Sequence, residues 1–186
     1  WKEIIDDYMG EEGVIINSYF FTAQSRPRCY WTNIQIDTPN KISDQRIIDI
    51  MEKGNIDKKY FFDKKLIKGL ETPLLKNSEI GIKKIYDIPR EILKDNERQR
   101  RVYSIYGKSP TLLARSDTAK IFYKKNIRKL TPLECERLQG IKDNYTSILS
   151  DTQRYKAIGN GFTIPVISNI LKNIGKTKKK QLRLFK

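Results

Sequence analysis

The chain has 186 residues, of which 38% are hydrophobic, and a net charge of +15. Ten Tyr, seven Phe and two Trp can supply the core of one large or two small domains and argue against wholesale disorder. The absence of histidine excludes histidine metal sites and histidine general bases, and two cysteines without a CxxC spacing argue against a disulfide framework. No apolar run is long enough to span a membrane and no signal peptide opens the sequence, which predicts a cytoplasmic protein with no membrane or metal partner.

Positive charge is concentrated in the middle of the chain. Residues 83–129 carry 14 basic and five acidic side chains, a net charge of +9. A polyanionic partner would explain this block, because each Lys or Arg that meets a phosphate releases condensed counterions. A solvated basic face in a lysine- and isoleucine-rich proteome explains the charge equally well. The tail at 176–186 is a basic extension of a kind that is often disordered.

In chain order, the first predicted element is a helix in "WKEIIDDYMG", and because the sequence begins inside it we expect a longer polypeptide. Residues 13–21 and 28–36 are rich in β-branched and aromatic side chains and predict two strands. Their connection, "TAQSRP", is too short for a parallel crossover, so the strands should be antiparallel. Residues 43–53 predict a helix with Ser43 as N-cap. The irregular pattern over 54–110 predicts a loop-rich small domain.

A short helix in "LTPLECERLQG" is the clearest local prediction. Thr131 is the N-cap, Pro132 takes the first helical position, and Glu134 completes a capping box. Gly140 supplies the C-terminal stop. The acidic neighbours of Cys135 would raise the pKa of its thiol, the opposite of what a nucleophile needs, so Cys135 is predicted to be structural.

Two more helices follow. One begins near Ser150, in "SDTQRYKAIGN", and another covers 164–175, opened by Pro165 and closed by Gly175. Between them "AIGNG" predicts a Gly-Asn-Gly turn, where glycines allow a close backbone approach and a helix start offers free N–H groups. A plain helix–helix turn is the alternative interpretation of these residues.

Three blocks in a fixed order carry a family resemblance: "AQSRPRCYW", "RKLTPLECERLQGIKDNY" and "RYKAIGNGFTIPVISNIL". They resemble the eighth, ninth and tenth motifs of the cytosine-C5 DNA methyltransferases, in the C-terminal half of that family and closest to its phage and animal de novo branch. The resemblance implies an α/β fold: the C-terminal part of a Rossmann-like methyltransferase domain, an antiparallel strand pair plus helices, with a small irregular target recognition domain inserted. It also implies a bacterial or phage-encoded protein that acts on DNA in the nucleoid.

The order of the motifs implies a domain organisation. Residues 1–40 would belong to the catalytic domain and residues 41–127 to the target recognition domain. Residues 128–175 would return to the catalytic domain, and residues 176–186 would form the basic tail.

The resemblance implies catalytic roles for the Gln-x-Arg-x-Arg of the eighth motif. Arg28 would contact the flipped-out cytosine, Arg26 would steady a DNA phosphate or a glutamate supplied from elsewhere, and Gln24 would share their side of the strand because side chains alternate with a period of two. Without the motif, two arginines on a solvated strand face would be the preferred interpretation. Asn160, Gly161 and Phe162 are implied as contacts to S-adenosylmethionine, although many relatives have a small hydroxyl residue where Gly161 stands.

The central segment is expected to bind duplex DNA. By resemblance, Thr111 and Leu112 would be presented to the DNA. Arginines and lysines around them would contact phosphates, which position the protein, or guanines, which specify the sequence; these are Arg98, Arg100, Arg101, Lys108 and Arg115. Arg128 resembles an arginine that ties the recognition domain to the catalytic core.

The family attacks C6 of cytosine with the thiolate of a Pro-Cys motif, beside a glutamate of a Glu-Asn-Val motif. Neither Cys29 nor Cys135 follows a proline. We therefore expect this chain alone to be inactive and to need the N-terminal half of the enzyme, in the same chain or as a separate subunit. The alternatives are a non-catalytic DNA-binding or regulatory module and a relative that acts on transfer RNA.

Overall fold

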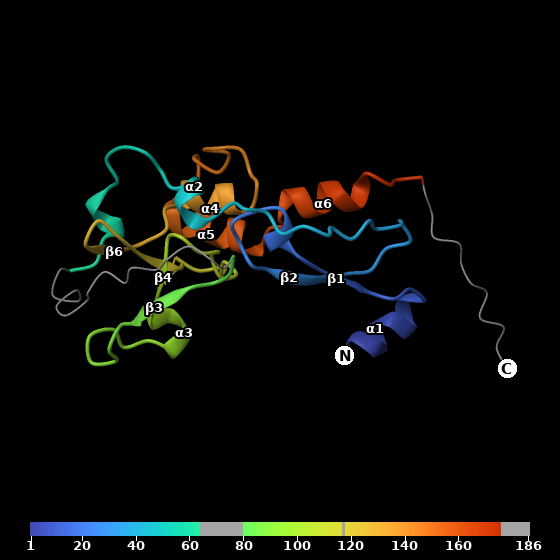
Figure 1. Cartoon of the computed structure of the whole chain (residues 1–186), viewed down its shortest axis with the longest axis horizontal. Coiled ribbons are helices and arrows are strands. Elements are labelled where there is room, and N and C mark those ends of the chain that lie inside the picture. The colour runs from blue at the N-terminus through green and yellow to red at the C-terminus, as the bar shows by residue number, and fades with distance from the viewer. Residues whose placement is uncertain (64–79, 117, 176–186) are drawn as a thin grey trace.

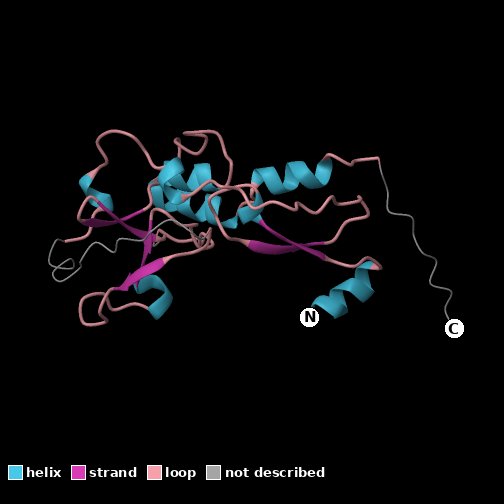
Figure 2. Ribbon diagram, in the orientation of Figure 1, coloured by secondary structure: helices cyan, strands magenta, loops and turns pink. Residues whose placement is uncertain are grey.

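The computed structural model describes residues 1–63, 80–116 and 118–175. The chain is elongated in the view of Figure 1, with the N-terminal helix near one end and a four-stranded sheet at the other. In that view most helices lie along one side and the strands lie below them (Figure 2). Within the described parts of the chain, no helix is long and apolar enough to cross a membrane. The predicted basic tail, 176–186, lies outside the described residues.

The N-terminal part contains the predicted helix and the predicted strand pair. Helix α1 (Lys2–Met9) ends at Gly10, whose φ of 62° is the left-handed conformation that suits glycine. Strands β1 (Val14–Asn17) and β2 (Pro27–Tyr30) are antiparallel, as expected, although both are shorter than predicted. The connection includes a short 3₁₀ helix, η1 (Ser18–Phe20). Ile16 of β1 is buried against the last helix of the chain.

A four-stranded mixed sheet forms most of the far end of the molecule. Its strands are β3 (Lys84–Asp87), β4 (Arg101–Ser104), β5 (Lys120–Tyr123) and β6 (Asn126–Lys129), in the order β3-β4-β5-β6. The β4–β5 pair is parallel and the two outer pairs are antiparallel. Two short helices, η2 (Lys58–Tyr60) and α3 (Glu97–Arg100), lie outside the sheet. The prediction of a loop-rich 54–110 segment was therefore wrong for β3 and β4, which are only four residues long and carry charges between their apolar side chains.

Four helices pack beside the two sheets. Helix α2 (Ile47–Ile50) is shorter than the predicted 43–53 helix and has Arg46 as its N-cap, because the Ser43 hydroxyl accepts the Gln45 N–H in a turn ahead of it. Helix α4 (Pro132–Leu138) has the predicted capping box. Helices α5 (Asp151–Asn160) and α6 (Ile164–Leu171) complete the set. The central core joins α2, α4 and α5 to the sheet through buried apolar side chains, among them Ile50, Ile121, Leu130, Leu138, Tyr155 and Ile158, while α6 packs in a separate cluster with β1.

Candidate nucleic-acid interface and active-site residues

The three polar residues of the Gln-x-Arg-x-Arg motif differ in exposure. Arg28 lies in β2 and is exposed, whereas Gln24 and Arg26 precede the strand and are buried, with exposed fractions of 0% and 6%. Gln24 forms an isolated bridge with Ser109 instead of a strand pair. The three residues therefore do not lie on one regular strand as expected, and their common side stays a prediction.

Arg26 is bound entirely to backbone carbonyls. Its Nη1 donates to the Leu112 oxygen at 3.1 Å, and its Nη2 donates to the oxygens of Gly159 and Gly161 at 2.8 and 3.1 Å. Burial lowers the pKa of the Arg26 guanidinium to about 10, with the charge of Arg28 acting in the same direction, so the group stays charged at neutral pH. The expected phosphate contact needs correction, because these donors face the interior of the protein.

Gln24 makes a second connection between the same segments. Its Oε1 accepts the Leu112 N–H at 3.1 Å, and its Nε2 donates to Oε1 of Gln139 at 3.3 Å. The Gln139 Nε2 then donates to the Ile158 oxygen at 2.9 Å, while its Oε1 also accepts the Thr163 hydroxyl at 2.7 Å. All these groups are buried, so the network holds the segment around Leu112 against the end of α5.

The Gly-Asn-Gly residues differ from the expected turn. Gly159 and Asn160 form the last turn of α5, and Gly161 is its C-cap. A Cβ atom on Gly159 would lie 2.2 Å from the Leu113 oxygen, which explains why only glycine fits here. Asn160 is exposed and Phe162 is 64% exposed. These two side chains therefore remain available to a ligand at the end of α5.

A cleft of about 430 Å³ lies between the eighth-motif segment and the α3–β4 region of the four-stranded sheet. Ser25 and Pro27 line one side, directly before the exposed Arg28. The other side is lined by Arg98 and Arg101, together with Gln99 and Tyr103 of the sheet region. The connecting segment contributes Pro110, Thr111, Leu113, Thr118 and Ala119. The structure thus brings together three of the seven predicted DNA-binding residues: Arg98, Arg101 and Thr111.

The other predicted DNA-binding residues lie elsewhere. Lys108 is 1% exposed and its Nζ donates to the oxygens of Thr22 and Ser43 at 2.8 and 2.7 Å, so this residue has no surface to offer a phosphate. The Leu112 side chain is also buried, at 4% exposed, and its exposed neighbour Leu113 faces the cleft in its place. Arg115 is exposed, 4.0 Å from Asp95.

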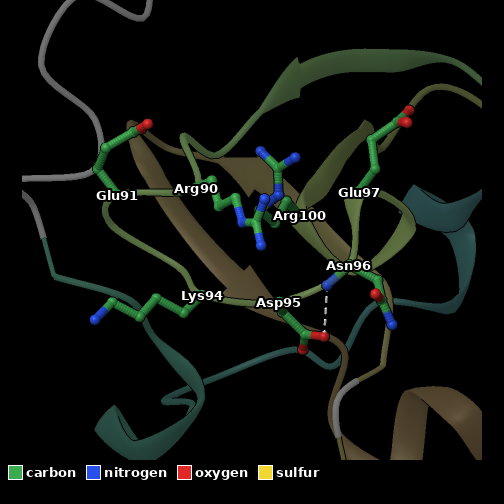
Figure 3. A pocket seen from close by; sticks show the side chains of 7 residues that line it. All are labelled: Arg90, Glu91, Lys94, Asp95, Asn96, Glu97 and Arg100. Atoms are coloured by element: carbon green, nitrogen blue, oxygen red, sulfur yellow. Dashed lines mark hydrogen bonds between the residues drawn. The ribbon is translucent and has the colours of Figure 1, made fainter.

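Arg100 lines a separate and wider cavity of about 790 Å³ (Figure 3). The cavity is bounded by Arg90, Glu91, Lys94, Asp95, Asn96, Glu97 and Arg100. Three basic and three acidic side chains offset one another here, so the cavity has no net charge to favour a polyanion. None of the eighth-, ninth- or tenth-motif residues lines it, and we assign the candidate site to the smaller cleft.

Arg128 and Cys135 are both buried, and the burial of Cys135 agrees with its predicted structural role. Arg128 of β6 donates through both terminal nitrogens to the Glu134 carboxylate of α4, at 2.7 Å each, with both side chains buried. This pair joins β6 of the four-stranded sheet to α4. Cys135 is 1% exposed, and burial raises the pKa of its thiol to about 12, with the nearby glutamates Glu134 and Glu136 acting in the same direction. A thiolate nucleophile is excluded at this position.

Three residues important to the arrangement were missed from the sequence. Ser25 and Pro27 lie inside the motif that was quoted, and their place between its polar residues was the available signal. Gly159 was visible as the first glycine of "AIGNG", but its packing against Leu113 depends on a loop 46 positions away in the sequence. That contact has no local signature.

Solved structures show which fold this is. A methyltransferase structure from S. pombe, Dnmt2, superimposes with a TM-score of 0.56 at 13% identity, covering 88% of this chain and 57% of that one. The EhMeth methyltransferase structure from Entamoeba histolytica gives a TM-score of 0.53 at 18% identity, covering 92% and 57%. The fold is therefore that of the α/β methyltransferases.

The family follows from the sequence comparison. The pattern of the C-5 cytosine-specific DNA methylases matches residues 7–176, and the chain belongs to this family. Type II methyltransferase M.SsoII of Shigella sonnei is 32% identical over 132 residues, 69% of this chain and 32% of that protein. M1.ScrFI of Lactococcus lactis subsp. cremoris is 31% identical over 142 residues, 75% of this chain and 33% of that protein. The match thus spans about a third of the length of these restriction–modification methyltransferases.

Proposed function

We propose that the chain is the C-terminal portion, or a subunit, of a DNA (cytosine-5-)-methyltransferase. It would supply target recognition and part of the active site for methyl transfer from S-adenosylmethionine to C5 of a flipped-out cytosine in duplex DNA. The observation that carries this proposal is the cleft, whose lining brings Ser25 and Pro27 together with Arg98 and Arg101. The likeness to the phage and de novo branch remains a prediction.

Arg28 would hold the target base. Its side chain is exposed, and its Nη1 donates to the Pro27 oxygen at 2.7 Å, which leaves other guanidinium donors for a ligand. A guanidinium presents these donors in one rigid plane, which suits the polar edge of an extruded cytosine. Arg98 and Arg101 would meet the DNA backbone or base edges across the cleft.

The end of α5 fits one edge of a cofactor pocket. Within the described residues the Asn160 side chain is exposed and has no hydrogen bond, and the exposed ring of Phe162 lies two positions on. When bound, S-adenosylmethionine supplies the methyl group. Asn160 would donate or accept a hydrogen bond at its rim, Phe162 would cover an apolar face, and Gly161 would keep the backbone accessible. Further contacts would come from the N-terminal portion.

The surface of the N-terminal elements supports a requirement for that partner. Trp1, Ile4 and Tyr8 recur at helical spacing on α1 and are 77%, 74% and 90% exposed, and Ile15 on β1 is 63% exposed. The β1–β2 sheet has only two strands among the described residues, and an isolated strand pair is marginally stable in water. An N-terminal portion that packs on this side would cover the apolar side chains and extend the sheet.

One observation favours a second candidate, a non-catalytic DNA-binding module: neither cysteine follows a proline, and Cys135 is buried. A methyl-transfer assay separates the two. The chain alone should transfer no methyl group from S-adenosylmethionine to duplex DNA, and adding the N-terminal portion encoded beside it should restore transfer. Methyl transfer by the chain alone would contradict the proposal that the nucleophile comes from the N-terminal portion. No transfer with any encoded N-terminal portion would favour the non-catalytic DNA-binding module.

The cleft itself is tested by binding. Duplex DNA should bind with a log–log salt slope of roughly −4 to −5, as expected for about five phosphate contacts. Arg98→Gln and Arg101→Gln should each weaken binding and reduce the slope by about 1, since each removes one phosphate contact. Arg90→Gln, in the other cavity, is the matched control and should leave both unchanged. An equal effect of all three variants, or tighter binding of transfer RNA than of duplex DNA, would contradict the assignment.

A further inference from the structure

The buried network around Arg26 joins the two ends of the candidate site. One end is the 111–113 segment, which lines the DNA cleft, and the other is the C-terminus of α5, where the exposed Asn160 lies. We propose that Arg26 is a positioning residue that couples the two, so that duplex DNA in the cleft orders residues 158–161 on the cofactor side. This inference rests on the proposed function and adds a linkage between its two ligands.

The geometry of the guanidinium makes the connection rigid. Nη1 holds the Leu112 oxygen, and Nη2 holds the oxygens of Gly159 and Gly161. The two nitrogens belong to one planar group, so their positions relative to each other are fixed. Because the donor is charged, each bond is stronger than a bond between neutral groups. A displacement of the Leu112 carbonyl therefore changes the position that is best for the carbonyls at the end of α5.

The end of α5 and the 111–113 segment are also in direct backbone contact. The Gly159 Cα faces the Leu113 backbone so closely that a Cβ would lie 2.2 Å from its oxygen and 2.6 Å from the Ala114 nitrogen. No side chain lies between the helix and the segment to absorb a shift. The two backbones must move together or separate.

Burial makes separation expensive. Arg26 is 6% exposed and Gln24 is 0% exposed, so water cannot replace a carbonyl that moves out of reach. Gln24 and Gln139 form a parallel connection from the Leu112 N–H to the Ile158 oxygen. The charged bonds of Arg26 should carry the larger share of the coupling, and the amide bonds the smaller share.

The test is backbone hydrogen exchange of the full chain, with and without duplex DNA. Exchange reports the local opening of each segment separately. DNA should slow exchange at Leu112 and, in the same titration, at residues 158–161, by about fivefold or more, the low end of coupling factors between linked sites. In Arg26→Lys the DNA should still protect Leu112, but protection of residues 158–161 should fall by at least half. A lysine keeps the charge and loses the fork.

Two further variants make the result specific. Arg137→Lys is the matched control, because Arg137 also donates to two backbone carbonyls, those of Ile50 and Met51, but lies outside the network. It should leave both protections intact. Gln24→Met cuts the parallel connection, should cause a partial loss, and serves if Arg26→Lys does not fold by circular dichroism.

The outcomes separate this inference from the proposed function. Failure of DNA to bind or to protect Leu112 in the wild-type chain would overturn the cleft and, with it, the coupling. Protection of Leu112 without residues 158–161 would overturn the coupling alone. Equal protection of residues 158–161 in the wild type and in every variant would show that DNA touches that segment directly, and would also overturn it.

Discussion

The buried ion pair of Arg128 and Glu134 tests how the four-stranded sheet is held to the helical core. The side chains are 1% and 0% exposed. The carboxylate accepts both terminal nitrogens of Arg128 at 2.7 Å and two backbone N–H groups, of Thr131 and Glu52, at 2.8 and 2.9 Å. Replacing Arg128 by Met therefore leaves a buried negative charge with half of its donors.

The expected loss of stability follows from these four hydrogen bonds. Removing one partner of a buried pair costs about 3–5 kcal/mol. The two backbone N–H groups remain, so we expect Arg128→Met to lower the free energy of unfolding by about 3–4 kcal/mol. Glu134→Gln should cost about 3–5 kcal/mol, because it strands a buried guanidinium whose Nε already has no partner among the described residues. In Arg128→Met/Glu134→Gln no unpaired charge is left and the amide oxygen can still cap α4, so the loss should be about 1–2 kcal/mol.

Urea unfolding followed by circular dichroism measures these losses. With a slope of about 2 kcal/mol per M, Arg128→Met should lower the midpoint by about 1.5–2 M. The matched control is Asp143→Asn, which breaks the more exposed Arg137–Asp143 pair at 2.6 Å and should cost less than about 1 kcal/mol. The reasoning would be refuted if the double variant lost as much free energy of unfolding as the two single variants together. It would also be refuted if Asp143→Asn lost as much as Arg128→Met.

Three further predictions concern single sites. In a Cys29→Ser background, Cys135 should stay unmodified by a maleimide at about pH 8 in native buffer and react rapidly in urea, because burial raises its pKa to about 12; native labelling would contradict this. Burial lowers the pKa of Lys108 to about 8, so the folded state releases this proton before the unfolded state does, and stability should rise by up to about 3 kcal/mol between about pH 8 and 10.5. The urea midpoint measured as a function of pH should show that rise in the wild type and not in Lys108→Met. The same pH dependence in both proteins would rule out a lowered pKa of Lys108. Gly159→Ala should lose about 1–3 kcal/mol through its clash with Leu113, while Gly81→Ala, where a Cβ meets nothing within 4 Å, should be nearly neutral in the same urea assay.

The parts of the fold that the sequence predicts well are those decided by neighbouring residues. The capping box of α4 needs only Thr131 and Glu134, three positions apart, and both reciprocal bonds are present. The β1–β2 pair is likewise decided by a connection too short for a parallel crossover. In these cases the local preference and the tertiary structure agree.

The failures share a different cause, which is that long-range contacts decide the outcome. In the sequence, Lys108 is one lysine of a basic segment and nothing nearby predicts its burial. In the structure its ammonium group donates to the backbone oxygens of Thr22 and Ser43, which lie far earlier in the chain. Arg26 and Arg28 are two residues apart, yet Arg26 is buried and bonded to Leu112 and Gly159, whereas Arg28 is exposed. The position of Arg98 and Arg101 across the cleft from Pro27 could not be derived from spacing either, because it depends on how the sheet docks.

The segment between β4 and β5 has a consequence for the order of folding. Both of its ends belong to one sheet, while its middle is bonded to the 23–26 segment, at contacts that join residues 86 and 88 positions apart. Closing such large loops is slow, because the entropy of the intervening chain is lost before any contact repays it. We therefore expect the cleft, whose lining includes this segment, to form late in folding. A duplex bound there would act as a late clamp on the native state, slowing unfolding more than it speeds folding.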